Sequence, residues 1–182
     1  MIESSLGWRN IASHVSLSDL SVMEQQMTKE ANLAATERWG AEVASAGRYD
    51  VLDEILAPHF VDHDAGSDQG PGIAGLKGFF QTMRSAFPDL KAEPVEVIAT
   101  DDHVAMRYTI SGTHQGDFQG VPPTGKHFKV AVLQLARCED GRCVERWGST
   151  DELGMMKQLG IFADVANGAK KEKSPVGALF GE

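Results

Sequence analysis

The sequence predicts an α+β fold in which a curled antiparallel sheet, covered by helices, forms a cone that encloses a pocket. Helical periodicity occupies most of the first half of the chain, and alternating strands joined by short turns occupy most of the second. Consecutive long hairpins curl strongly, and the helices must then cover the concave face of the sheet. With 182 residues, of which 42% are hydrophobic, the chain has the length of about one domain and enough apolar material for a core.

The first half contains most of the predicted helices. In order, we expect a helix over residues 21–46, a short helix over residues 50–56, a short strand over residues 60–64 and a helix over residues 73–87. Ser21 and Glu24 have the spacing of a capping box, in which each side chain caps the backbone of the other residue. Gly47 offers the first helix a left-handed C-terminal cap. Pro58 and Pro88 end the other two helices, because the residue before a proline avoids helical geometry.

The second half contains the predicted sheet. We expect strands over residues 95–100, 103–114, 127–138 and 142–149, followed by a short helix over residues 151–159. On the second of these strands, Val104, Met106, Tyr108 and Ile110 alternate with other residues, so they share one face of the sheet.

Two cysteines flank the strongest turn signal in the chain. Asp140-Gly141 is a typical two-residue hairpin turn, and it places Cys138 opposite Cys143 on the paired strands. Their Cα atoms are then close enough for a disulfide. We favour reduced thiols, because the N-terminus lacks an export signal and disulfides are rare inside cells. No second Cys or His pair has zinc-ligand spacing, so no metal site is expected.

Charge and composition exclude several classes of partner. The formal net charge is −9, from 17 basic and 26 acidic residues, which argues against nucleic acid and anionic membrane surfaces. No apolar run approaches the roughly 20 residues that span a bilayer. We therefore expect a cytoplasmic protein with an N-terminal arm (residues 1–20), a single cone-shaped domain (21–163) and a flexible C-terminal tail (164–182).

Three motifs in a fixed order resemble one known family. They are AFPDL (residues 86–90), GTHQGDFQGVPPTGK (112–126) and ERWGSTDELGMMKQLG (145–160). Together they resemble the SnoaL-like polyketide cyclase, or ester cyclase, family, within the group that includes ketosteroid isomerase and nuclear transport factor two. The resemblance covers about residues 30–162. It implies an α+β cone, a homodimer formed through the outer sheet face, and chemistry without a metal or an organic cofactor.

Two residues are the predicted catalytic groups. His63 falls at the end of the short strand, in a place that resembles the position of the ketosteroid isomerase base, and an imidazole can serve as base or acid near neutral pH. Asp151 matches the aspartate of the W-x-x-x-D-x-x-G pattern of the resembled family. The alternatives are a structural histidine bonded to a loop carbonyl and an aspartate that caps a short helix.

The chain departs from the resembled family at the acid/base position. In the polyketide aldol cyclases an essential aspartate sits three residues before the equivalent of Asp151, and that position is Gly148 here. A histidine of those enzymes aligns with Gln134. The resemblance therefore favours the family more strongly than it favours aldol cyclisation.

Other candidates are predicted to bind substrate in the pocket: Trp39, Tyr108, His114, Gln134, Arg146 and Trp147. The tryptophans can stack on a flat substrate, although both are also typical of a core, which we favour for Trp147. Arg146 can stabilise an enolate or form a surface salt bridge. His114 stands at the mouth of a Gly- and Pro-rich loop, interpreted as a pocket rim or a dimer contact.

These observations predict a cofactor-independent lyase, isomerase or cyclase that acts on a hydrophobic, aromatic or polycyclic small molecule in a closed pocket. His63 would move the proton and Asp151 would orient or relay it. Two alternatives stay open, because the same cone serves other roles. One is a non-catalytic small-molecule-binding or protein-interaction domain, and the other is a regulatory subunit.

Overall fold

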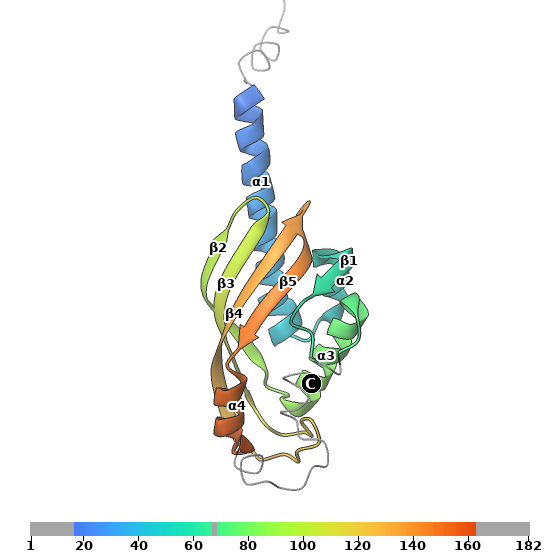
Figure 1. Ribbon diagram of the computed structural model, residues 1–182, viewed down its shortest axis with the longest axis vertical. Helices are drawn as coiled ribbons and strands as arrows, with labels where there is room; N and C mark the ends of the chain where they lie inside the picture. The colour runs from blue at the N-terminus through green and yellow to red at the C-terminus, as the bar shows by residue number, and fades with distance from the viewer. Residues whose placement is uncertain (1–16, 67–68, 163–182) are drawn as a thin grey trace, which may run out of the picture.

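The computed structural model describes residues 17–66 and 69–162 and shows an α+β fold built on one five-stranded sheet (Figure 1). The helical segments are α1 (Leu17–Arg38), the π-helix η1 (Trp39–Ser45), the 3-10 turn η2 (Tyr49–Val51), α2 (Leu52–Ile55), α3 (Gly72–Ala86) and α4 (Glu152–Leu159). The strands are β1 (Leu56–Asp62), β2 (Lys91–Ala99), β3 (His103–Thr113), β4 (His127–Glu139) and β5 (Arg142–Thr150). The predicted fold class and element order are confirmed.

The sheet has the strand order β1-β5-β4-β3-β2 and is not closed into a barrel. Strands β2 to β5 form the predicted antiparallel series, and β1 adds to the far side of β5 in parallel. Helix α1 runs along the sheet and extends past its end, while α3 stands beside β1 (Figure 1). Helix η1 packs against β2, and α3 packs against β1.

The first predicted helix continues as a π-helix before it ends. Ser45 explains part of this geometry, because its hydroxyl donates to the Gly40 carbonyl at 2.8 Å and accepts from the Ala92 amide at 3.1 Å. Gly47 then turns the chain with a φ of 73°, as its lack of a Cβ allows. The segment thereby presents Trp39 to the interior, where it is 7% exposed.

The hairpin register at the two cysteines agrees with the turn signal. Asp140 and Gly141 both have positive φ, at 49° and 73°, and Cys138 pairs with Cys143 across β4 and β5. Both thiols are free and buried. Burial raises the pKa of Cys138 to about 11 and that of Cys143 to about 12, so both are protonated at neutral pH.

Three elements begin four residues earlier than predicted: α1, β2 and β1, which spans Leu56–Asp62 rather than residues 60–64. Helix α1 begins at Leu17, four residues before the capping-box serine and inside the predicted arm. Strand β2 begins at Lys91 rather than at residue 95, and therefore contains Pro94. A proline is tolerated there because β2 is an edge strand with a bulge between Pro94 and Glu96. The rest of the arm and the predicted tail lie outside the described residues.

The core consists of two apolar clusters. One joins η1, α2 and β1 to α3 and includes Val43, Leu52 and Phe60, and the other joins the end of α3 to β4 and α4 and includes Phe87 and Leu159. Across the described ranges, no helix combines the length and the apolar character needed to cross a bilayer.

Candidate active site

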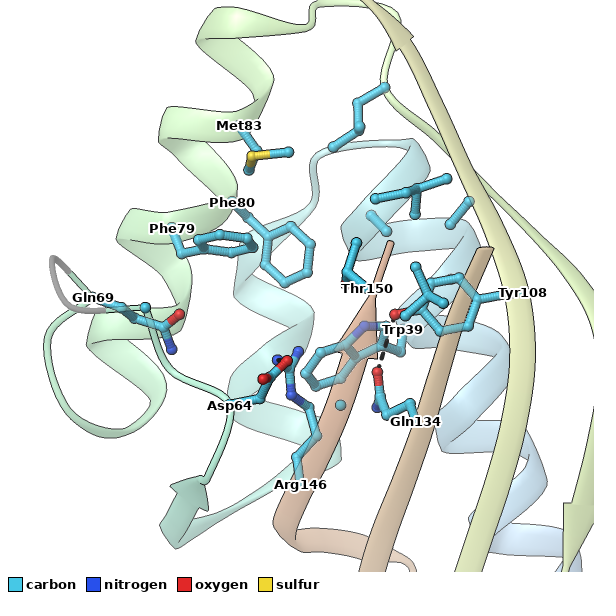
Figure 2. Close-up of a pocket in the computed structure, with 18 of the residues that line it drawn as sticks. Trp39, Asp64, Gln69, Phe79, Phe80, Met83, Tyr108, Gln134, Arg146 and Thr150 are labelled. Atoms are coloured by element: carbon cyan, nitrogen blue, oxygen red, sulfur yellow. Dashed lines mark hydrogen bonds and ion pairs between the residues drawn. The ribbon is translucent and has the colours of Figure 1, made fainter. Parts of the chain in front are cut away.

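A cavity of about 1240 Å³ lies between the concave face of the sheet and the helices η1 and α3 (Figure 2). Its wall is mostly apolar and includes Trp39, Phe80, Met83, Met106, Ile110 and Met156. Helix α3 presents its apolar face to this space because its hydrophobic residues recur at helical spacing. A small number of polar side chains interrupt the wall, which is the usual composition of a small-molecule site.

A buried ion pair forms the floor of the polar region. Arg146 Nε lies 3.0 Å from Asp62 Oδ1, and the two side chains are 11% and 2% exposed. Asp62 also accepts hydrogen bonds from the Asp64 amide at 3.1 Å and from Gln69 Nε2 at 2.9 Å. This carboxylate is therefore well satisfied, and it fixes the orientation of the guanidinium.

Asp64 is a second carboxylate near Arg146, and it lines the cavity. Its Oδ2 lies 3.6 Å from Arg146 Nη2, and its side chain is 42% exposed and lines the cavity. Burial raises the pKa of the Asp64 carboxyl, while the positive charge of Arg146 offsets part of that rise. An aspartate with a raised pKa beside a fixed cation is a good candidate for proton transfer.

Gly148 makes room for this carboxylate. A Cβ on Gly148 would lie 2.6 Å from Asp64 Oδ2, which is closer than real Cβ contacts. Any side chain at position 148 would therefore displace Asp64. The Asp64 carboxylate, which follows β1, thus occupies the space that a side chain at position 148 of β5 would need.

Tyr108 and Gln134 complete the polar region on the sheet side. Tyr108 donates a hydrogen bond to Gln134 Oε1 at 3.2 Å, and both residues line the cavity (Figure 2). Gln134 pairs in register with Gly148, so the polar groups form one continuous band across β3, β4 and β5. Burial raises the pKa of Tyr108, and the phenol stays protonated and able to donate.

Four of the predicted site residues line the cavity: Trp39, Tyr108, Gln134 and Arg146. Trp39 packs edge-on against Phe80, with ring centroids 5.9 Å apart. The Arg146 guanidinium carbon lies 5.9 Å from the centre of the Trp39 ring. The aromatic wall and the charged group are therefore in direct contact, which suits a flat ligand that carries oxygens.

His63 and Trp147 lie on the other side of the sheet. Their rings stack with centroids 4.6 Å apart and planes within 4° of parallel. His63 Nε2 lies 2.9 Å from Glu145 Oε2, and neither ring is part of the cavity wall. Trp147 is 37% exposed, so it belongs neither to the cavity nor to the core. Alternation along β5 explains the placement of Trp147, because its neighbour Arg146 points inward, and His63 lies in the turn directly after β1.

Asp151 caps helix α4. Its Oδ1 accepts a hydrogen bond from the Gly154 amide at 2.8 Å, and its carboxylate lies where a Cβ on Gly154 would stand. Asp151 is exposed and does not line the cavity. The structure therefore gives it the geometry of the capping alternative.

His114 is fully buried beneath the loop that follows β3. Its Nδ1 accepts from the Thr124 amide at 3.3 Å, and its Nε2 is buried without a hydrogen-bond partner. Burial lowers the pKa of the ring, which favours the neutral form. Phe118, from the same loop, reaches the cavity wall, so the loop forms part of the rim. His114 is buried under the loop and bonds to Thr124 within it.

Sequence reasoning missed Asp62, Asp64 and Glu152, which also lines the cavity. A signal for the first two was present. Phe60 is an obvious core residue, and strand alternation places Asp62 on the same face, two residues before Asp64 in the turn after β1. Within residues 17–66 and 69–162, no cluster of three or more His, Cys, Asp or Glu side chains could hold a metal ion.

The open, curled sheet and the helix-covered cavity define an α+β protein of the nuclear transport factor two-like class. The family model for the SnoaL-like polyketide cyclases matches residues 34–159. The chain belongs to this family, as the three sequence motifs predict.

Named relatives share most of this domain. The nogalonic acid methyl ester cyclase of Streptomyces nogalater is 28% identical over 121 residues, which are 64% of this chain and 88% of the relative. The aklanonic acid methyl ester cyclase DnrD of Streptomyces peucetius is 25% identical over 123 residues, which are 65% of this chain and 84% of the relative.

Solved structures agree with this assignment. The structure of IdmH, a putative polyketide cyclase from Streptomyces antibioticus, has a TM-score of 0.63 and 34% identity, and the match covers 71% of this chain and 98% of IdmH. TsrD from Streptomyces laurentii has a TM-score of 0.67 and 25% identity, with 73% of this chain and 97% of TsrD covered.

Proposed function

We propose that this protein is a cofactor-independent cyclase that closes a ring in a hydrophobic polyketide by acid/base chemistry, with Asp64 as the base. The observation that carries the proposal is the Asp64 carboxylate, held beside Arg146 in a mostly apolar cavity. It lies against the backbone of Gly148, which aligns with the acid/base aspartate of the aldol cyclases in the resembled family. The chain thus supplies a carboxylate from β1 where those enzymes supply one from β5.

The first step is removal of a proton next to a carbonyl. Asp64 takes the proton, and the electron pair of the broken C–H bond passes into the enolate. Arg146 favours the ionised form of Asp64 before the step, and Asp62 keeps Arg146 in place. The enolate carbon then attacks a second carbonyl of the same molecule, and a carbon–carbon bond closes the ring.

Negative charge develops on oxygen in both parts of this reaction. Tyr108 and Gln134 carry the hydrogen-bond donors that line the sheet side of the cavity, in the band that includes Gly148. Donors fixed in a site with little water stabilise such a charge strongly. We assign the oxyanion contact to the amide nitrogen of Gln134, whose Oε1 accepts the hydrogen bond from Tyr108.

The size and lining of the cavity favour a large, flat substrate. Its volume of about 1240 Å³ exceeds the roughly 300–1,000 Å³ of ordinary ligand pockets. Trp39 and Phe80 offer aromatic surfaces on which fused rings can stack. Two of the relatives are cyclases of methyl esters of nogalonic and aklanonic acid, which points to polyketide methyl esters as the first substrates to test.

We also propose a homodimer formed through the outer face of the sheet. That face exposes large apolar side chains on its strands: Ile98, Leu133, Leu135 and Trp147. An exposed apolar patch of this kind marks an interaction surface. Light scattering should give twice the chain mass, and Leu135→Lys should shift the protein toward the monomer. A wild-type protein that stays monomeric at high concentration would exclude this assembly.

The test of the function is turnover of polyketide methyl esters by purified protein, followed by mass spectrometry and ultraviolet absorbance. Asp64→Asn keeps the shape of the side chain and removes the base, so kcat/KM should fall by roughly 100-fold or more. Asp151→Asn is the matched control, because asparagine caps a helix as well as aspartate does. Substrates that quench tryptophan fluorescence without ever being converted would instead indicate a binding domain.

A further inference from the structure

We propose that Glu152 is a second catalytic carboxylate, which donates a proton to the acceptor oxygen while Asp64 removes one from carbon. This inference rests on the proposed cyclase function and adds an acid to its base. It assigns the two proton transfers of ring closure to two different residues that line the same cavity.

The position of Glu152 is the first observation. It is the first residue of α4, two residues after Thr150 at the end of β5, and both Glu152 and Thr150 line the cavity. Asp151 fixes this start of the helix through its bond to the Gly154 amide. Asp151 is therefore a positioning residue for Glu152, and the predicted importance of that segment has a structural basis.

The second observation is that Glu152 lacks a cation. Within the described ranges, no hydrogen bond or ion pair reaches its carboxylate, although the side chain is half-buried. Other glutamates of the same domain are paired: Glu42 and Glu54 with Arg38, Glu93 with Lys91, and Glu145 with Arg137. A half-buried carboxyl without a partner is most stable in the neutral, protonated form.

The third observation is the contrast between the two cavity carboxylates. Arg146 stands 3.6 Å from Asp64 and favours its ionised form. Burial raises the pKa of Glu152, and the negative charge of Asp64 raises it further. Burial raises the pKa of both carboxyl groups, but a cation stands beside Asp64 alone, and environments that differ in this way assign base and acid roles.

The proton balance of the reaction closes without another reactant. Asp64 accepts the proton of the C–H bond, and the enolate carbon bonds to the acceptor carbonyl carbon. The π electron pair of that carbonyl moves to its oxygen, which takes the proton from the Glu152 O–H bond. Asp64 ends protonated and Glu152 ionised, and exchange with water after product release restores the starting state.

The first test is the pH dependence of kcat/KM on a polyketide methyl ester. The wild type should give a bell-shaped profile, with Asp64 on the acidic limb and Glu152 on the basic limb. Glu152→Gln should lower kcat/KM by roughly 100-fold and remove the basic limb. Glu152→Asp, which keeps the acid, should recover part of the rate. Glu30→Gln is the matched control, because Glu30 is exposed on α1 and does not line the cavity.

The second test needs no substrate. Carboxyl carbon resonances followed by NMR should show Glu152 titrating above an ordinary glutamate, and Asp64→Asn should shift that titration toward lower pH. If the Glu152→Gln variant converts polyketides as well as the wild type does at every pH, the acid role is overturned and the cyclase function stays intact. A wild type that converts no polyketide ester would overturn both.

Discussion

The two sides of strand β5 carry similar charged groups in opposite surroundings. On the concave side Arg146 pairs with Asp62, and the two side chains are 11% and 2% exposed. On the other side Glu145 pairs with Arg137 and His63, whose side chains are 33% and 38% exposed. The inner pair is fixed and dry, whereas the outer group is in contact with solvent.

The difference shows how one-residue alternation decides the role of a polar side chain. At the end of β1, Asp62 pairs with Arg146 in the interior; in the turn that follows, Asp64 lines the cavity and His63 stacks on Trp147 outside it. An ion pair in solvent contributes little to stability, whereas a buried charge depends strongly on its partner. Chemistry is therefore expected from Asp64, with Asp62 fixing its partner Arg146, rather than from the histidine.

The largest expected effect comes from removing the inner cation. Arg146→Met leaves the Asp62 carboxylate buried without its partner, and we expect a loss of about 3–5 kcal/mol in the free energy of unfolding. Chemical denaturation measures this loss. Arg137→Met, on the outer side, should cost far less. Adding Asp62→Asn to Arg146→Met should recover part of the stability, and equal losses for the two arginine variants would contradict the comparison.

The next effect concerns the space shared by Gly148 and Asp64. Gly148→Ala should push the Asp64 carboxylate away from its position and lower kcat/KM by roughly 10-fold to 100-fold, because displacement of a reacting group by about 1 Å has this cost. Ser149→Ala changes the neighbouring residue, which is exposed, and should leave turnover unchanged. Steady-state kinetics and a crystal structure of Gly148→Ala would test both the rate and the displacement.

A smaller effect should appear in the pH dependence of stability, with opposite signs on the two sides. The folded pKa of Asp64 is raised, so its stabilising contribution is present below its unfolded pKa of about 4 and is lost as pH rises through the folded value. Asp64→Asn should therefore be more stable than the wild type at pH 7. The difference should vanish toward pH 3.

Glu145 should behave in the reverse manner. Arg137 and then His63 lower its pKa, so its contribution is present above the unfolded value and is lost as pH falls through the folded value. Glu145→Gln should be less stable than the wild type at pH 7 and similar to it in acid. Thermal unfolding of both variants from pH 3 to pH 7 measures the two slopes, and slopes of the same sign would contradict the assignment.

The smallest effect is expected for His63. His63→Gln removes an exposed ion pair and a ring stack on the outer face, so kcat/KM should stay within about twofold of the wild type, equivalent to about 0.5 kcal/mol. A 100-fold loss of kcat/KM in His63→Gln would identify His63 as the base. It would contradict the assignment of chemistry to the concave side of the sheet alone.

Much of the fold was predictable because local signals decide it. The alternation along β3 and the Asp140-Gly141 turn specify strands and register, and Gly47 and Gly160 adopt the left-handed geometry that ends a helix. The π-helix was not predictable, because the bond between Ser45 and Ala92 joins segments that are far apart in sequence. Tertiary contacts of that kind leave no local pattern.

The site was predictable only in part, for the same reason. Aromatic and amide residues on the inner face of β3 and β4 follow from alternation, as Tyr108 and Gln134 show. The prediction of His63 as the base followed from the chemistry of the imidazole. It did not use the even residue spacing between Asp64 and the core residue Phe60. The partnership of Arg146 with Asp62 spans 84 residues, so one sequence carries no sign of it.

The edge strand β2 constrains how copies of this protein can meet. Pro94 has no amide hydrogen to offer a further strand, and the bulge beside it breaks the regular spacing of bonding groups. Ser45 occupies both the amide and the carbonyl of Ala92 on the same border. A strand of a second copy therefore cannot extend the sheet along β2. Copies of this protein must contact one another through surfaces other than the edge of β2.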